Sequence, residues 1–114
     1  MTDAVLMQPV FALGFIERAR GLLGTNASWG DSGRVLVIAP CKSVHTIGMR
    51  YSLDIAFANK QGIVLRAERD VKPGRLLSCR HATLVLERPH RDEAWVEVGG
   101  GMKFSRDSIN EQLR

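Results

Sequence analysis

Several features that define other classes of protein are scarce or absent in this chain. No apolar run approaches the roughly 18 residues of a transmembrane helix. The N-terminus, MTDAVLMQPV, has no basic segment and carries Asp3 where a secretory signal would carry Lys or Arg. Two cysteines are fewer than small secreted scaffolds usually contain, although they leave one disulfide, Cys41–Cys79, as an open alternative. The sequence therefore predicts a cytoplasmic protein that does not associate with membranes.

Aromatic residues are also few, at 6% of the chain, and the most basic stretch contains none. Residues 66–91 hold seven Arg or Lys and three Asp or Glu, a surplus of +4 that equals the net charge of the whole chain. A basic patch can attract an anionic partner such as a nucleic acid. Without Phe, Tyr or Trp, however, this stretch offers no side chain on which bases could stack. We therefore expect a solvated face, and weak nucleic acid binding through 66–91 is only a second functional alternative.

What is present suits one globular domain. The 114 residues suffice to bury a hydrophobic core without disulfides or a metal. Hydrophobic residues make up 45% and charged residues 25%, as in ordinary globular proteins. Because no repeat, low-complexity tract or linker interrupts the chain, we predict a single domain over residues 1–114.

Two segments have the features of helices. Near the N-terminus, five apolar residues recur at helical spacing and form one stripe: Phe15, Ile16, Ala19, Leu22 and Leu23. Gly24 follows them, and glycine readily adopts the left-handed conformation that ends many helices. Near the other end, Ser105 is a suitable N-cap for residues 106–113. The sequence thus predicts an N-terminal amphipathic helix and a short C-terminal helix.

The strands outnumber the helices. Two alternating runs, 53–58 and 63–68, flank the turn residues 59–62 and predict a β-hairpin. The apolar run 34–39 predicts a central strand covered on both faces, and 82–88 predicts another strand. Because one helix precedes the strands and does not alternate with them, we predict an α+β fold and not a βαβ fold. Its sheet should be compact, mostly antiparallel and barrel-like.

The residue types that can take part in catalysis or binding are concentrated between Pro40 and Phe57, in a loop that joins the central strand to the hairpin. Folds often hold reactive groups on a polar loop between two rigid strands. The candidate binding residues of this loop are Ser43, His45, Thr46, Arg50 and Asp54. We predict a module that binds a small ligand or a partner protein at the 40–54 loop and uses no cofactor.

An enzymatic alternative rests on Cys41 and His45, which are four residues apart. A histidine can lower the pKa of a nearby thiol and so provide a nucleophilic thiolate, with Asp54 or Asn59 as the third member of the site. A cysteine at the end of a buried strand also often simply packs. One Cys and one His are a weak signature, so the sequence leaves open whether the chain is an enzyme.

A metal site is the other chemistry that these residue types suggest. Two pairs, Cys41 with His45 and Cys79 with His81, together offer four ligands of the kind that zinc prefers. Their spacings are unlike those of common zinc modules, so we predict no metal. His45, Thr46 and Ser43 can instead brace the loop by hydrogen bonds, with Asp54 as acceptor.

Four motifs occur in an order that resembles a known family: ERARGLLG at 17–24, PCKSVHTIGMRYSLDIAF at 40–57, VKPGR at 71–75 and VLE at 85–87. The chain resembles the domain-of-unknown-function family 192 of small prokaryotic proteins over about residues 14–104. The resemblance implies a compact β-rich domain and no particular activity. Relatives often carry Gly-Asp after the late strand, where this chain reads Gly99-Gly100-Gly101.

Overall fold

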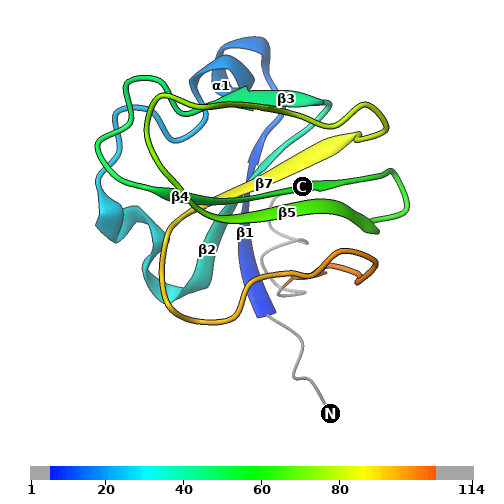
Figure 1. The fold of residues 1–114 in the computed structure, drawn as a ribbon. Helices are drawn as coiled ribbons and strands as arrows, with labels where there is room; N and C mark the ends of the chain where they lie inside the picture. Colours follow the sequence, from blue (N-terminus) through cyan, green and yellow to red (C-terminus); the bar gives the residue numbers. More distant parts are fainter. Residues whose placement is uncertain (1–5, 105–114) are drawn as a thin grey trace.

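The structure, a computed structural model, describes residues 6–104 (Figure 1). The elements in chain order are β1 (Leu6–Ala12), α1 (Phe15–Arg20), the 3₁₀ segment η1 (Ala27–Gly33), β2 (Arg34–Ile38), β3 (Ser43–His45), β4 (Leu53–Ala58), β5 (Val64–Val71), β6 (Leu76–Ser78), β7 (Leu84–Pro89) and β8 (Lys103–Phe104). Within these residues, no helix combines the length and the apolar character that a membrane span requires. The helix predicted over 106–113 lies outside the described residues.

Most strands belong to one sheet of order β5-β4-β7-β2-β1-β8, and β3 pairs with β6 in a second, two-stranded sheet. The three pairings β5–β4, β4–β7 and β7–β2 are antiparallel, so the predicted β-rich, mostly antiparallel α+β fold is confirmed. The barrel-like closure is not confirmed. Within residues 6–104 the end strands β5 and β8 do not pair with each other, and the sheet stays open.

The best-defined sequence predictions concern the middle of the sheet, and they are confirmed. Strands β4 and β5 form the antiparallel hairpin, with Ala56 opposite Ala67. Every residue of β4 is buried, because β4 lies between β5 and β7 and both faces of the sheet are covered. Strand β2 is likewise buried from Val35 to Ile38, as a continuous apolar run requires.

The N-terminal part of the chain contains one connection of the βαβ type, although the fold as a whole is α+β as predicted. Strands β1 and β2 are parallel, and α1 and η1 lie in the connection between them. Strand β8 pairs with β1 at Leu6 and Met7. Among the described residues β8 extends no further along β1, so Pro9, which has no backbone N–H to donate, interrupts no pairing with β8.

The N-terminal helix is shorter than predicted, and none of its residues is buried. Phe15 and Ile16, expected on the core-facing stripe, are 80% and 75% exposed. The reason is that the helix ends at Gly21, whose φ of +54° takes the chain out of the helical path. Leu22 then enters the core from the turn after the helix and not from the helix itself.

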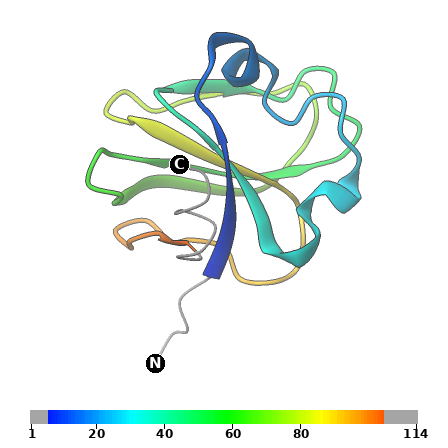
Figure 2. The same ribbon diagram turned by 180° about the vertical axis from the view of Figure 1, so that it is seen from behind.

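The two faces of the large sheet carry separate clusters of buried apolar residues. One cluster includes Leu22, Leu36, Ile55 and Phe57 and extends to the small β3–β6 sheet. The other includes Met7, Val37, Leu86 and Trp95. In both views α1 and β3 lie together at one end of the molecule, away from the segment 91–101 (Figures 1 and 2). This end contains the pocket described next.

Candidate functional site

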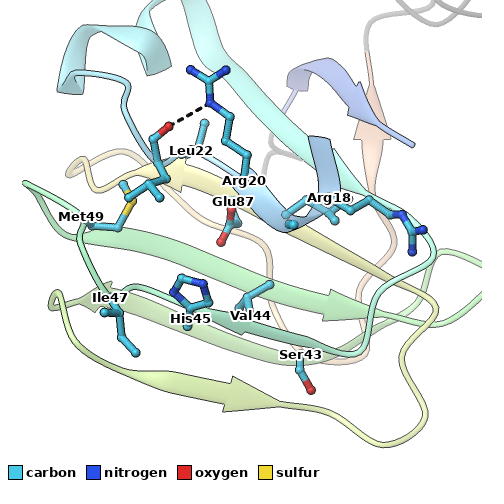
Figure 3. A pocket seen from close by; sticks show the side chains of 13 residues that line it. Arg18, Arg20, Leu22, Ser43, Val44, His45, Ile47, Met49 and Glu87 are labelled. Atoms are coloured by element: carbon cyan, nitrogen blue, oxygen red, sulfur yellow. Dashed lines mark hydrogen bonds between the residues drawn. The ribbon is translucent and has the colours of Figure 1, made fainter. Parts of the chain in front are cut away.

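A pocket of about 230 Å³ lies between the chain around α1 and the small β3–β6 sheet (Figure 3). One side is formed by residues 18–23 and the other by β3 and the turn at 47–49. Most of its lining residues are apolar, and the large apolar side chains among them are Leu22, Leu23, Ile38, Val44, Ile47 and Met49. An apolar cavity with a few convergent polar groups is the usual form of a small-molecule site.

The polar group deepest in this pocket is the carboxyl of Glu87, which is only 3% exposed. On β7, Glu87 lies opposite Leu36 of β2 and opposite Ile55 of β4, so its side chain shares their apolar face. Burial raises the pKa of this carboxyl to about 7, and a hydrogen bond from the backbone N–H of Leu22 opposes the rise. Near neutral pH the group can therefore both accept and release a proton.

Two arginines and a histidine also line the pocket. Arg18 donates from Nη1 to the carbonyl oxygen of Pro40 at 3.0 Å, and Arg20 donates from Nε to that of Leu23 at 3.2 Å. Figure 3 shows both guanidinium groups directed away from Glu87, with His45 on the β3 side of the pocket. Within residues 6–104, Glu87 forms no ion pair.

Gly21 explains how the turn after α1 passes so close to the carboxyl. Its φ is +54°, and a Cβ added there would lie 2.9 Å from Oε1 of Glu87. A side chain at this position would push against the carboxyl and adopt a strained backbone conformation. Glycine thus keeps both the turn and the floor of the pocket in place.

Only part of the predicted binding set lines this pocket, namely Ser43 and His45, both exposed. Thr46 is fully buried beside it: Oγ1 donates to the carbonyl oxygen of Lys72 at 2.7 Å and accepts from the backbone N–H of Arg75 at 2.8 Å. It therefore braces the 72–75 turn. Arg50 is exposed and is not among the lining residues.

Asp54 belongs to a different cluster, in which it is fully buried on β4. Its carboxylate accepts from Nε of Arg88 at 2.8 Å and from the backbone N–H of Asp70 at 3.0 Å, and it lies 2.7 Å from Nδ1 of His90. The carboxylate thus ties β4 to β5 and β7. The histidine beside it is His90, which the sequence had not singled out, and not His45.

The two cysteines are free, and both pack against the apolar cluster around Leu22 and Phe57. The thiol of Cys41 donates to the carbonyl oxygen of Ser43 at 3.1 Å, and burial raises its pKa. A raised pKa keeps the thiol protonated, the opposite of an activated nucleophile. Among the described residues, no three His, Cys, Asp or Glu side chains are grouped to hold a metal ion.

The basic residues of 66–91 are largely committed to the chain itself. Arg66 donates to the carbonyl oxygen of Ser78 at 2.9 Å, and Arg69 donates to that of Glu93 at 2.9 Å. Arg88 is buried and forms an ion pair with Asp54. Lys72 pairs with Asp70, and Arg91 pairs with Glu93. These contacts reduce what the stretch can offer to phosphate groups.

The fold and pocket together define a small β-rich α+β domain with a buried acid beneath an apolar cavity. The chain matches the model of the domain-of-unknown-function family 192 (DUF192), described as "Uncharacterized ACR", over residues 5–105, and it belongs to this family. The resemblance seen in the sequence motifs is therefore confirmed. None of the curated proteins matches the chain.

Two solved structures share the fold. One is a protein of unknown function from Novosphingobium aromaticivorans DSM 12444, with a TM-score of 0.62 and 18% identity over 74% of this chain. The match spans 64% of that protein, less than two thirds of its length. The other, from Sinorhizobium meliloti 1021 and provisionally described as a transcription regulator, has a TM-score of 0.65 and 14% identity over 74% of this chain and 69% of its own. At these identities the likeness concerns the fold alone.

Proposed function

We propose that this protein binds a small molecule with an apolar body in the pocket above Glu87. The ligand would lie between the turn after α1 and the β3 side, in contact with Ser43 and His45 of the 40–54 loop. The remaining members of the predicted binding set, Thr46, Arg50 and Asp54, would act outside direct contact.

The observation that carries this proposal is the buried carboxyl of Glu87, which has no ion-pair partner within residues 6–104, at the base of an apolar cavity. A buried carboxylate without a counter-ion is costly, and an apolar residue would fit the β7 position between Leu36 and Ile55 at lower cost. Groups with strongly perturbed pKa values in clefts are frequent at functional sites. The acid at this place therefore supports a role in binding and not in stability.

A partner protein is the second candidate, because large apolar side chains are exposed around the same end of the molecule. Phe15 and Ile16 of α1, Ile47 beside the pocket and Leu76 on β6 are all more than half exposed. Clusters of this kind often mark interaction surfaces. The enzymatic alternative receives less support, because the pKa of Cys41 is raised.

A fragment screen followed by methyl NMR tests the small-molecule proposal. Bound fragments should shift the methyl signals of Leu22, Val44 and Met49, which line the pocket, and leave that of Ile63, outside it, unchanged. Shifts confined to other methyl groups, or none from a broad screen, would contradict the proposal.

A matched pair of variants separates ligand from partner. Ile47 and Leu76 are 60% and 74% exposed, but only Ile47 lines the pocket. Ile47→Ala should weaken fragment binding severalfold, whereas Leu76→Ala should leave it unchanged. Equal weakening by both would favour a broad docking surface.

A further inference from the structure

We propose that the pocket takes a small primary amine, whose ammonium group pairs with the Glu87 carboxylate while its apolar body lies along the pocket walls. This inference rests on the proposed function, because it assumes that the pocket is a ligand site. It goes further by stating the chemical class of the ligand.

In the part of the chain that the structure describes, no group of opposite charge pairs with Glu87. From β2 and β4 the neighbours in the sheet are Leu36 and Ile55, both apolar. The turn after α1 contributes the backbone N–H of Leu22. Burial is the main cause of the raised pKa values of Cys41 and Tyr51, and the charge of Glu87 adds to both shifts. Neither group is cationic.

The charged or titratable groups that line the pocket beside Glu87 are Arg18, Arg20 and His45. Both guanidinium groups bond to backbone carbonyl oxygens and point away from the carboxyl (Figure 3). His45, on β3, is exposed to solvent. Nε of Arg18 is buried without a partner, but its guanidinium is directed away from the carboxyl. Among the described residues, no charged hydrogen-bond donor therefore pairs with Glu87 when it is ionised.

An ammonium group meets that need better than a hydroxyl or a carboxylate. It carries a full positive charge and three N–H donors, and the carboxylate has about four acceptor positions, of which Leu22 uses one. Hydrogen bonds between charged groups are about twice as strong as neutral ones. A ligand carboxylate would instead place a second negative charge beside a buried acid, which is unfavourable.

The volume limits the size of the amine. A dry cavity of about 150 Å³ in another protein holds benzene, with six carbon atoms. The pocket here is about 230 Å³. An aliphatic amine of roughly six to nine non-hydrogen atoms would therefore fit, with its carbon chain against Leu22, Ile38, Val44 and Met49.

Protonation links this binding to pH. An alkyl ammonium group stays charged through neutral pH, as the Lys side chain does. Glu87 must be ionised to pair with it, and its pKa is raised to about 7. Binding of the amine should therefore release a proton and strengthen as pH rises from 6 to 8, by about tenfold.

The experiment compares three probes that share one branched carbon skeleton: 3-methylbutylamine, 3-methylbutan-1-ol and 3-methylbutanoate. Each is titrated into the protein at pH 6 and pH 8 and followed by the methyl signals of Val44 and Met49. We expect the amine at pH 8 to bind at least tenfold tighter than either other probe. We also expect its affinity to fall about tenfold at pH 6.

Variants test the assigned carboxyl. Glu87→Gln should remove both the preference for the amine and its pH dependence, while binding of the alcohol persists. Glu97→Gln, at an exposed position outside the pocket, is the matched control and should bind like the parent. The comparison of probes and pH values in the parent protein does not depend on either variant.

The outcomes separate the two proposals. If the alcohol or the carboxylate binds in the pocket at least as well as the amine, the amine assignment is wrong and the ligand site stands. Amine binding that does not change with pH, or that survives Glu87→Gln, also overturns the assignment. If no probe shifts the pocket methyl groups even at millimolar concentration, both proposals fail for ligands of this size.

Discussion

Replacing Glu87 with glutamine should make the fold more stable at neutral pH and should do so in a pH-dependent way. The carboxyl is buried between Leu36 and Ile55, and its pKa is raised from the ordinary 4.5 to about 7. Each pH unit of such a difference corresponds to about 1.4 kcal/mol. Ionising Glu87 in the folded protein is therefore about 3 kcal/mol less favourable than in the unfolded chain.

The direction of the effect follows from which state holds the proton more tightly. Because the folded pKa of Glu87 is the higher one, its favourable contribution is fully present below pH 4.5 and is lost as pH rises to about 7. The free energy of unfolding of Glu87→Gln, minus that of the parent, should therefore increase by about 3 kcal/mol between pH 4 and pH 8. The carboxamide has nearly the same shape, so packing changes should largely cancel from this comparison.

Urea denaturation at several pH values, followed by tryptophan fluorescence, measures this difference. Trp95 is buried and Trp29 packs against the other core cluster, so both report unfolding. Glu97→Gln, at an exposed position, should show no comparable trend and serves as the control. A difference between Glu87→Gln and the parent that stays constant from pH 4 to pH 8 would refute the placement of a perturbed carboxyl in the pocket.

Three substitutions and one alkylation measurement test other parts of the structure. Gly21→Ala should lower the free energy of unfolding by about 1–3 kcal/mol, since its Cβ meets the Glu87 carboxyl and its φ is positive; chemical denaturation measures this. Asp54→Asn should cost about 3–5 kcal/mol, because it leaves buried Arg88 unpaired; a melt like that of the parent would contradict the cluster. Thr46→Val should cost about 1–3 kcal/mol in the same assay through two lost hydrogen bonds. Cys41 should react with iodoacetamide more slowly than free cysteine at pH 7.5, and faster alkylation would revive the catalytic alternative.

The sequence predicts those parts of the fold in which local pattern and tertiary surroundings agree. In the β4–β5 hairpin, the alternating runs and the turn between them determine the register of the two strands locally. The continuous apolar run of β2 is typical of a strand covered on both faces. The prediction for the N-terminal helix is wrong in length and burial, because the apolar periodicity over 15–23 does not reveal that the chain leaves the helix at Gly21. The turn there depends on a close approach to Glu87, which is distant in sequence.

The candidate site depends even more on contacts between residues that are distant in sequence, which local patterns do not predict. The alternation in 82–88 places Glu87 on the strand face opposite Leu84 and Leu86, as is typical of a solvated position. The pattern therefore does not indicate that Glu87 is buried. In the structure β7 is the third strand of a six-stranded sheet covered on both faces, so both of its faces are buried. An acid inside the short motif VLE was the one available signal. The Asp54–His90 contact spans 36 residues and depends on the pairing of β4 with β7, which no local spacing encodes.

The most direct test of the pocket above Glu87 is a titration of that carboxyl itself. The carbon-13 signal of the Glu87 side-chain carboxyl can be followed from pH 4 to pH 9, first in the free protein and then with saturating 3-methylbutylamine. We expect a pKa of about 7 in the free protein and a fall of at least about one unit with the amine, since an opposite charge nearby favours the ionised form. A pKa near 4.5 in the free protein would contradict a buried Glu87 carboxyl in the pocket. A raised value that the amine leaves unchanged would contradict its pairing with an ammonium group.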